Sequence, residues 1–175
     1  MRHAAVDLKS LLSQAKEMEL LQNHGTGQKR SWAFVYAREL NYAYPEGWMF
    51  TEESVELIGS FVLHVDGKYP TEELDKLSFK VSFVVLLKDN FNIESPVILK
   101  LALPDGSTQV IAYKLMDYPR NTPISLKAGE FFNTFDSGDI KFALDGSEIE
   151  TWKQGLVIYG VYIGPTNAHP KMNDK

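Results

Sequence analysis

The stretch Trp152-Lys153-Gln154-Gly155-Leu156-Val157-Ile158-Tyr159-Gly160-Val161-Tyr162-Ile163-Gly164-Pro165 is the most continuous apolar run in the sequence that turn residues bound on both sides. On an extended chain its residues alternate between two faces, with Leu156, Ile158 and Gly160 on one and Val157, Tyr159 and Val161 on the other. A strand that is apolar on both faces is covered by other layers, so the run predicts a central strand. Gly160 inside it predicts a bulge or a close backbone approach.

From residue 31 onward the hydrophobic residues recur with the period of two that is typical of strands. We expect strands at residues 32–37, 55–65, 77–87, 97–103, 110–115, 124–126, 131–132 and 140–144. Strand 97–103 pairs with 77–87 or with 110–115, and the latter pair gives the clearest hairpin signal. Asp66-Gly67 predicts a turn, and residues 70–74 predict a short helical turn. Strands spaced by about ten residues, without alternating helices, predict an antiparallel β-sandwich of jelly-roll type.

The segment 4–22 predicts a single amphipathic helix before the strands begin. Its apolar stripe consists of Leu8, Leu11, Leu12, Ala15, Met18 and Leu21. The stripe docks on the main domain or on a second copy of the chain, and the second option is the basis for expecting a homodimer. The remaining alternative is a frayed tail. We therefore divide the chain into a helix and linker at 1–30, a sandwich at 31–165 and a flexible tail at 166–175.

Composition excludes several classes of protein. The 175 residues include no cysteine, which favours a reducing compartment, and we expect the protein in the cytoplasm. The sequence has no signal-peptide pattern and no apolar stretch of membrane-spanning length, so we expect no membrane partner. A net charge of −5 disfavours a nucleic-acid binder, RNA included.

Catalytic and cofactor patterns are missing from the sequence. The four histidines His3, His24, His64 and His169 lie far apart and do not show metal-ligand spacing. The chain has no cysteine nucleophile and no Gly-x-Ser-x-Gly elbow, and its glutamates lie in contexts typical of solvated surface. We therefore expect no enzyme activity, no metal and no cofactor.

The segment 41–50 is the most informative for function. It carries Tyr42, Tyr44, Trp48 and Phe50, interrupted by proline and glycine. Four aromatic side chains so placed do not fit one buried strand face, and exposed aromatics on a loop are typical of recognition. Flat rings suit sugars, because the axial C–H groups of a pyranose form an apolar face. The alternative is that Trp48 and Phe50 cap the open end of the sandwich.

Four segments, in the same order, resemble the phloem lectin family, also called Nictaba-like or phloem protein 2-like. They are residues 37–40 (Ala-Arg-Glu-Leu), 77–87 with Phe91 and Pro96-Val97 after them, 129–132 (Gly-Glu-Phe-Phe) and 152–165. The resemblance covers roughly residues 32–165 and implies a plant lectin of phloem sieve-element sap, active in defence. It implies binding of N-acetylglucosamine oligomers, as chitin-type oligosaccharides or N-glycan cores of glycoproteins. Tyr44 occupies the place of the family's first tryptophan, and Trp48 belongs to the second aromatic cluster.

The expected mechanism is stacking of sugar rings on Tyr44 and Trp48, supported by a few hydrogen bonds. Tyr118, Glu148 and Glu150 are further candidates, the last two because they precede the final strand. Trp152 begins that strand, and core packing is the favoured interpretation for it. The rival hypothesis is a non-catalytic protein–protein interaction module on the same sandwich.

Overall fold

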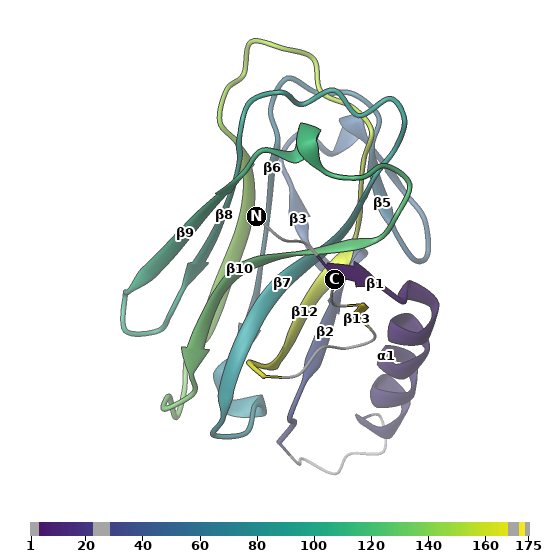
Figure 1. Ribbon diagram of the computed structural model, residues 1–175. Coiled ribbons are helices and arrows are strands. Elements are labelled where there is room, and N and C mark those ends of the chain that lie inside the picture. The colour runs from purple at the N-terminus through teal and green to yellow at the C-terminus, as the bar shows by residue number, and fades with distance from the viewer. Residues whose placement is uncertain (1–3, 23–28, 168–171, 174–175) are drawn as a thin grey trace.

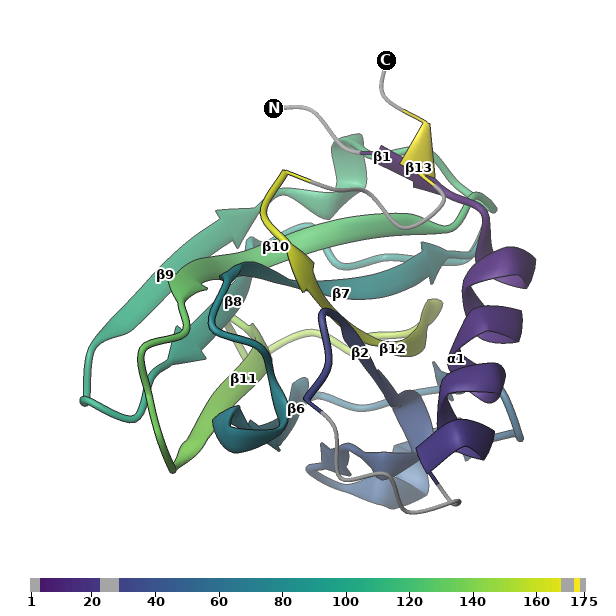
Figure 2. The ribbon, with the colours of Figure 1, turned by 90° about the horizontal axis from the view of Figure 1, so that it is seen from below.

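The computed structural model describes residues 4–22, 29–167 and 172–173 (Figure 1). Two antiparallel sheets face each other, as the sequence predicts, and one helix lies beside them (Figures 1 and 2). The larger sheet runs in the order β13 (Met172–Asn173), β1 (Ala4–Val6), β10 (Ile124–Phe132), β7 (Ser78–Leu87), β12 (Leu156–Pro165), β5 (Val55–Leu57), β4 (Trp48–Phe50), and β2 (Ala33–Tyr36) also pairs with β12. The prediction of a jelly-roll sandwich is confirmed.

The smaller sheet runs in the order β3 (Asn41–Tyr42), β6 (His64–Pro70), β11 (Asp139–Gly146), β8 (Val97–Ala102), β9 (Thr108–Tyr113). The helices are α1 (Leu8–Gln22) and the short 3-10 turns η1 (Ala37–Glu39), η2 (Pro45–Gly47), η3 (Thr71–Glu73) and η4 (Leu115–Asp117). The hairpin of β8 and β9 confirms the stronger of the two expected pairings.

The strand β12 is central, as its sequence predicts. It pairs with β7 on one side and with both β2 and β5 on the other. The expected bulge is present, because the register with β7 shifts between Ile158 and Gly160. Gly160 has φ of +155°, and a Cβ atom there would collide with the Val35 carbonyl and the Phe34 ring. The position therefore requires glycine, both for its backbone and for its close contact with β2.

The bulge also changes which side chains of β12 face the core. Leu156 and Ile158 point into the sandwich, and beyond the bulge Val161 and Ile163 do so as well. The prediction that Val161 shares a face with Val157 is therefore wrong, because the extra residue reverses the alternation.

The core fills the space between the two sheets. Phe79, Val81, Phe83 and Val85 of β7 point into it together, as predicted. The ring of Phe83 meets that of Phe142 from β11 edge to face, with centroids 6.1 Å apart. Aromatic pairs prefer this arrangement, which here joins the two sheets.

Two predictions about strands are wrong. The expected strand 55–65 is broken after Leu57, and its two ends belong to different sheets as β5 and β6. Asp66-Gly67 forms no turn, because both residues lie within β6. A Cβ atom on Gly67 would collide with Leu40 and Phe142, so the glycine serves close packing in a strand.

The helix α1 begins later than predicted and packs against its own chain. Residues 4–6 form β1 on the edge of β10, so the expected helical start at residue 4 is wrong. The Asp7 carboxylate accepts a hydrogen bond from the Ser10 backbone N–H at 3.1 Å, which caps the first turn. Leu11 is buried against Val84 and Tyr162, and α1 thereby covers the outer face of the larger sheet (Figure 2).

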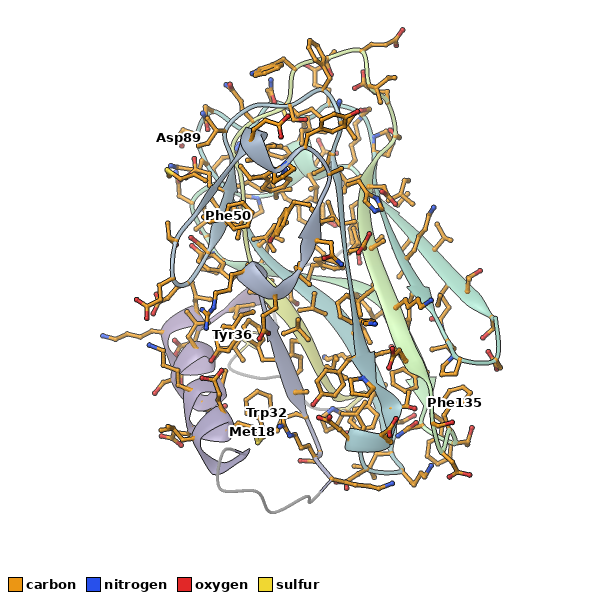
Figure 3. The ribbon with its side chains drawn as sticks, turned by 180° about the vertical axis from the view of Figure 1, so that it is seen from behind. Met18, Trp32, Tyr36, Phe50, Asp89 and Phe135 are labelled. Carbon is orange, nitrogen blue, oxygen red and sulfur yellow. The ribbon has the colours of Figure 1, made fainter. Side chains whose placement is uncertain are left out.

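Docking of α1 within the chain explains why β12 is apolar on both faces. Met18 and Trp32 lie close together where the helix crosses β2 (Figure 3). Because the same chain covers Leu11, Leu12 and Ala15, these residues of the stripe give no support to a homodimer. The expected linker falls largely on residues 23–28, outside the described residues. Within the expected tail, Met172–Asn173 pair with β1.

We expect Leu11→Ala to destabilise the fold and Leu20→Ala to leave it nearly unchanged. Leu11 is fully buried, whereas Leu20 is 62% exposed on the same helix. Removing a buried leucine side chain costs about 2–5 kcal/mol. That lowers the melting temperature of a chain of this size by roughly 4–20 °C. Thermal melts of both variants check this, and equal melting temperatures would contradict the docking of α1.

Candidate functional site

A hollow of about 360 Å³ is lined by loop residues at the end of the sandwich where β12 begins. These loops lie at the top of Figure 1. Three aromatic side chains from three separate loops line it. They are Tyr44 before η2, Phe61 between β5 and β6, and Trp152 before β12. Their exposed fractions are 57%, 49% and 51%, so each presents about half of its surface to solvent. We call this set the aromatic hollow.

The rings of the aromatic hollow are held in a defined geometry. Phe61 and Trp152 meet edge to face, with centroids 5.1 Å apart and an interplanar angle of 79°. The indole of Trp152 lies directly over Gly59, where a Cβ atom would collide with it. Glycine at this position therefore lets the ring lie against the backbone.

Backbone hydrogen bonds tie the three loops together. The N–H groups of Ile58 and Gly59 both donate to the Gly47 carbonyl, at 2.9 and 3.1 Å. Ser60 and Lys153 exchange two backbone hydrogen bonds, of 3.1 and 2.8 Å. The loops that carry the three rings are thus joined to one another as well as to the sheets.

Tyr44 adopts an unusual backbone conformation at the rim of the hollow. Its φ of +54° and ψ of +64° lie in the left-handed region, which residues other than glycine seldom enter. Its carbonyl accepts a hydrogen bond from the Gly47 N–H at 3.0 Å, across the turn that Pro45 begins. Strain of this kind is concentrated at binding and catalytic sites.

A buried lysine supports the hollow from below. Lys153 has no exposed surface, and its Nζ donates to the carbonyls of Phe61 at 2.6 Å and Thr151 at 3.1 Å. It also forms an ion pair with Glu148, with 2.7 Å between Nζ and Oε1. The hydrogen bond from Lys153, and a second from Thr151, hold the pKa of Glu148 below its usual range. Lys153 and Glu148 therefore fix the loops on both sides of the Phe61–Trp152 pair.

The residues predicted from segment 41–50 separate into two groups. Tyr44 lines the hollow, but Trp48 is only 5% exposed and packs on Tyr42, with ring centroids 4.7 Å apart. Tyr42 donates its hydroxyl to the Ala37 carbonyl at 2.7 Å, and burial raises its pKa. Phe50 (labelled in Figure 3) is half-exposed, meets the Tyr42 ring edge to face and does not line the hollow. Trp48 thus packs in the core cluster, whereas the alternative from the sequence was that Trp48 and Phe50 cap the open end of the sandwich.

Trp152 and Phe61 were not expected at the site. The favoured interpretation of Trp152 as a core residue is wrong, because half of its side chain is exposed. Phe61 was missed, although Gly59-Ser60 before it signals a break in the expected strand. Of the additional candidates, Tyr118 is half-buried against the core and Glu150 is exposed, and neither lines the hollow.

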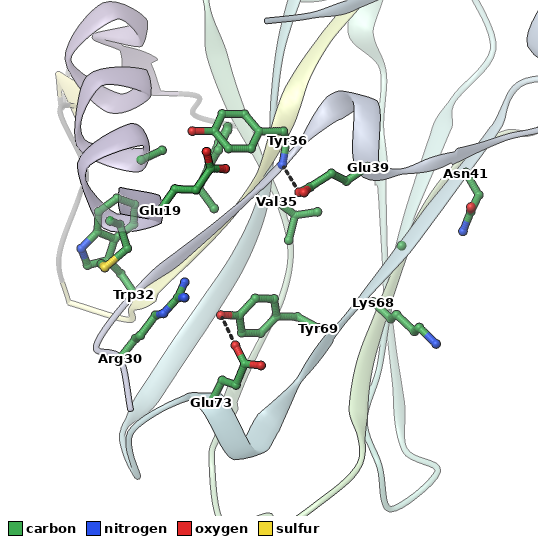
Figure 4. Close-up of a pocket in the computed structure, with 14 residues that line it drawn as sticks. Glu19, Arg30, Trp32, Val35, Tyr36, Glu39, Asn41, Lys68, Tyr69 and Glu73 are labelled. Atoms are coloured by element: carbon green, nitrogen blue, oxygen red, sulfur yellow. Dashed lines mark hydrogen bonds between the residues drawn. The ribbon is translucent and has the colours of Figure 1, made fainter. Parts of the chain in front are cut away.

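A second cavity, of about 440 Å³, lies between α1 and strands β2 and β6 (Figure 4). Two of its carboxylates bond protein groups, since Glu39 accepts from the Tyr36 N–H and Glu73 accepts from the Tyr69 hydroxyl, both at 3.2 Å. Arg30 Nη2 is buried without a hydrogen-bond partner among the described residues. The charged residues of the wall are Glu19, Arg30, Glu39, Lys68 and Glu73. Because they oppose one another in sign, the wall favours no single class of charged ligand.

Among the residues that the structure describes, no three histidine, aspartate or glutamate side chains are grouped so that they could hold a metal ion. Within the same residues, none of the helices combines the length and the apolar character needed to cross a bilayer.

Two solved sandwich structures resemble this chain distantly. The C-terminal CBM6 of LamC from Zobellia galactanivorans has a TM-score of 0.42 at 11% identity, over 76% of this chain and 98% of that one. TmCBM61 in complex with β-1,4-galactotriose has a TM-score of 0.38 at 14% identity, over 80% of this chain and 92% of that one. At this distance neither bears on what the present chain binds.

Three plant proteins share a higher sequence identity with this chain than the two solved structures do. Protein PHLOEM PROTEIN 2-LIKE A2 of Arabidopsis thaliana is 37% identical over 109 residues, which are 60% of this chain and 56% of that protein. Protein PHLOEM PROTEIN 2-LIKE A1 of the same plant is 31% identical over 76% of this chain and 58% of its own length. A Luffa acutangula protein named Lectin is 31% identical over 66% of this chain and 56% of its own length. The chain thus spans little more than half of the length of these relatives.

The family model described as Phloem protein 2 matches residues 21–165, which is most of the chain, and the chain therefore belongs to the phloem protein 2 family.

Proposed function

We propose that the chain is a lectin that binds N-acetylglucosamine oligomers at the aromatic hollow. The observation that carries the proposal is the set of three half-exposed rings, Tyr44, Phe61 and Trp152, which line one hollow from three joined loops. A neutral sugar offers no charge, so its affinity comes from apolar contact and oriented hydrogen bonds. Exposed rings on a rigid frame supply the apolar contact with little loss of side-chain freedom.

Polar groups at the rim complete the proposed site. Glu46 in η2 is exposed beside the hollow, and its carboxylate accepts hydrogen bonds from sugar hydroxyls or from the N–H of an acetamido group. The Ser60 hydroxyl is less available, because it donates to the Val62 carbonyl at 2.8 Å. Among the described lining residues Glu46 is the one carboxylate, whereas glycoside hydrolysis uses a facing pair. We therefore assign binding without bond cleavage.

Membership of the phloem protein 2 family and the name of the Luffa relative support this function. The family's name also supports a place in plant phloem, and we infer the cytoplasm or sieve-element sap as the location. The physiological partners would then be chitin-type oligosaccharides or glycoproteins with N-glycan cores. The competing function is a protein–protein interaction module that uses the same rings.

Titration calorimetry with chitotriose and with cellotriose tests the proposal. These sugars share a β-1,4-linked backbone but differ in the acetamido groups, so we expect clear binding of chitotriose and at least about tenfold weaker binding of cellotriose. Equal binding of both would contradict the N-acetylglucosamine specificity. Binding of neither, together with equal capture of a glycoprotein before and after removal of its glycans, would favour the protein–protein module.

The variant Gly59→Ala tests whether the hollow is the site. It keeps all three rings but places a Cβ atom where the Trp152 indole lies, so the ring must move. We expect chitotriose affinity to fall by about tenfold or more, since ring position determines stacking. The melting temperature should change little, because the displaced ring is at the surface. Unchanged chitotriose affinity would place the site elsewhere.

A further inference from the structure

The outer face of the smaller sheet carries a second, chemically different hollow, of about 490 Å³. Apart from Gly67 and the core residue Phe142, its residues come from the outward positions of four strands, β6, β11, β8 and β9, together with β3 at the edge. The residues that give the hollow its charge and its shape are Asp66, Lys68, Lys100, Ala102, Lys141 and Ala143. None of its lining residues belongs to the aromatic hollow. We call it the lysine hollow.

The strand register brings three lysines together. Lys141 of β11 stands directly opposite Lys68 of β6 and opposite Ala102 of β8, which makes Lys100 its diagonal neighbour. Directly opposed side chains have Cβ atoms about 5 Å apart, and diagonal ones about 7–8 Å. Like charges directly opposite each other destabilise a sheet. On a chain of net charge −5, this concentration of positive charge is local and does not reflect the overall composition.

These lysines are weakly paired within the protein. Lys68 reaches Asp139 and Lys100 reaches Asp145 only at 3.9 Å. Lys141 has no ion-pair partner among the residues that the structure describes. Long, exposed ion pairs contribute little to stability, so the three ammonium groups remain available to an external anion.

Two of the nearby carboxylates, those of Asp66 and Asp145, are engaged by a histidine. His64 Nε2 lies 2.7 Å from Asp66 Oδ2, and its Nδ1 bonds the Asp145 carboxylate. Asp66 also accepts a hydrogen bond from the Asn41 amide at 2.9 Å. Burial lowers the pKa of His64, but its bonds to Asp145 and Asp66 outweigh this and raise it. His64 thereby offsets part of the negative charge beside the lysines.

The floor of the lysine hollow leaves room for a ring. Ala143 lies between Asp66 and Lys100 in the register, and Ala102 is the partner of Thr108. The two alanines in the middle and the longer side chains around them form a shallow depression. Asn41 and Thr108 supply hydrogen-bonding groups at its rim. Hydroxyls of a ring suit the polar rim, and an anionic substituent suits the lysines.

We propose that the lysine hollow binds acidic oligosaccharides, whose carboxylate or sulfate groups lie between Lys68, Lys100 and Lys141. The site is separate from the aromatic hollow and takes a different ligand class. It does not depend on the neutral-sugar function proposed above.

Titration of the full chain with trigalacturonate, a heparin tetrasaccharide and neutral galactotriose tests the proposal. We expect at least one acidic sugar to bind and galactotriose to bind far more weakly. Binding of trigalacturonate would show that carboxylates are sufficient, whereas binding of the heparin tetrasaccharide alone would show that sulfate groups are required. Binding should weaken as salt rises from low to physiological concentration, because exposed charges are screened. The proposal fails if neither acidic sugar binds, or if galactotriose binds equally well. It also fails if a short oligouridylate binds as tightly as the sugars, which would indicate a general polyanion surface.

Substitutions locate the binding. Lys141→Gln should weaken acidic-sugar affinity by about fivefold, the effect of one charge contact near a protein surface, and Lys141→Glu should weaken it further. Lys114→Gln is the matched control, because Lys114 is exposed and outside the hollow. Equal loss in Lys114→Gln and Lys141→Gln would overturn the assignment to this face. Chitotriose titrations of the same variants separate this proposal from the lectin function, since the two hollows share no lining residue.

Discussion

Trp152→Ala is expected to remove most chitotriose binding while leaving the melting temperature nearly unchanged. The indole is half-exposed and lies over Gly59 at the edge of the aromatic hollow, so little core packing is lost with it. Truncating a central aromatic anchor typically costs about 2 kcal/mol or more in binding free energy. That is about a thirtyfold loss of affinity, which makes a weak oligosaccharide ligand undetectable.

Trp48→Ala should have the opposite effects, a clear loss of thermal stability and little direct loss of chitotriose binding. Trp48 is 5% exposed and packs on Tyr42, so its removal opens a cavity. Large buried aromatics cost about 3–5 kcal/mol when truncated, which lowers the melting temperature of a chain of this size by roughly 6–20 °C. Thermal melts and calorimetry on the two variants distinguish the roles. Full-strength chitotriose binding by Trp152→Ala would exclude the aromatic hollow as the sugar site.

The architecture could be predicted because its main signals are local. The two apolar faces of β12, the alternation along β7 and the β8–β9 hairpin all follow from the period of residues within one segment. The helix α1 was also visible as a stripe. Its place on the outer face of the larger sheet was not, because the partners Val84 and Tyr162 are distant in sequence. A stripe shows that a helix docks and does not show where.

Errors arose where packing between distant segments decides the conformation. The alternation of residues 55–65 continues across the break after Leu57, so Gly59-Ser60 is the one local sign that the strand is interrupted, and nothing in the pattern shows that the chain changes sheets. Asp66-Gly67 carries a turn signal, yet Gly67 lies inside β6 beneath Leu40 and Phe142. At Gly67 the close packing of Leu40 and Phe142, and not the local turn preference, therefore determines the conformation.

The aromatic hollow was predicted only in part for the same reason. Segment 41–50 indicated a loop with exposed aromatics, and Tyr44 is one of them. Trp48 begins β4 and Trp152 lies in the loop before β12, and the sequence does not distinguish a buried tryptophan from an exposed one. What distinguishes them is Gly59 beneath Trp152 and the bond from Lys153 to Phe61, residues 92 positions apart in the sequence.

Lys153→Met is expected to lower both the stability of the chain and its affinity for chitotriose. Methionine is flexible and of similar length, so it fills most of the space. It leaves the Phe61 and Thr151 carbonyls without their donor and removes the cation beside Glu148, which keeps its hydrogen bond from the Thr151 hydroxyl at 2.9 Å. Leaving a buried polar group without its hydrogen bond costs about 1–3 kcal/mol, or roughly 2–12 °C in melting temperature. The matched control Lys114→Met removes an exposed ammonium group and should melt like the parent.

A double-variant cycle separates the ion pair from the backbone bonds. Glu148→Gln alone leaves the buried ammonium with no carboxylate, and Lys153→Met with Glu148→Gln leaves no charge in the pair. If the pair acts as a unit, the double variant should lose less stability than the sum of the two single variants. The loss of stability that remains in the double variant comes from the unpaired carbonyls of Phe61 and Thr151. It should be accompanied by weaker chitotriose binding, because the hydrogen bonds to those carbonyls fix the loops of Phe61 and Trp152. A Lys153→Met protein that melts and binds like the parent would show that the hollow keeps its shape without this lysine.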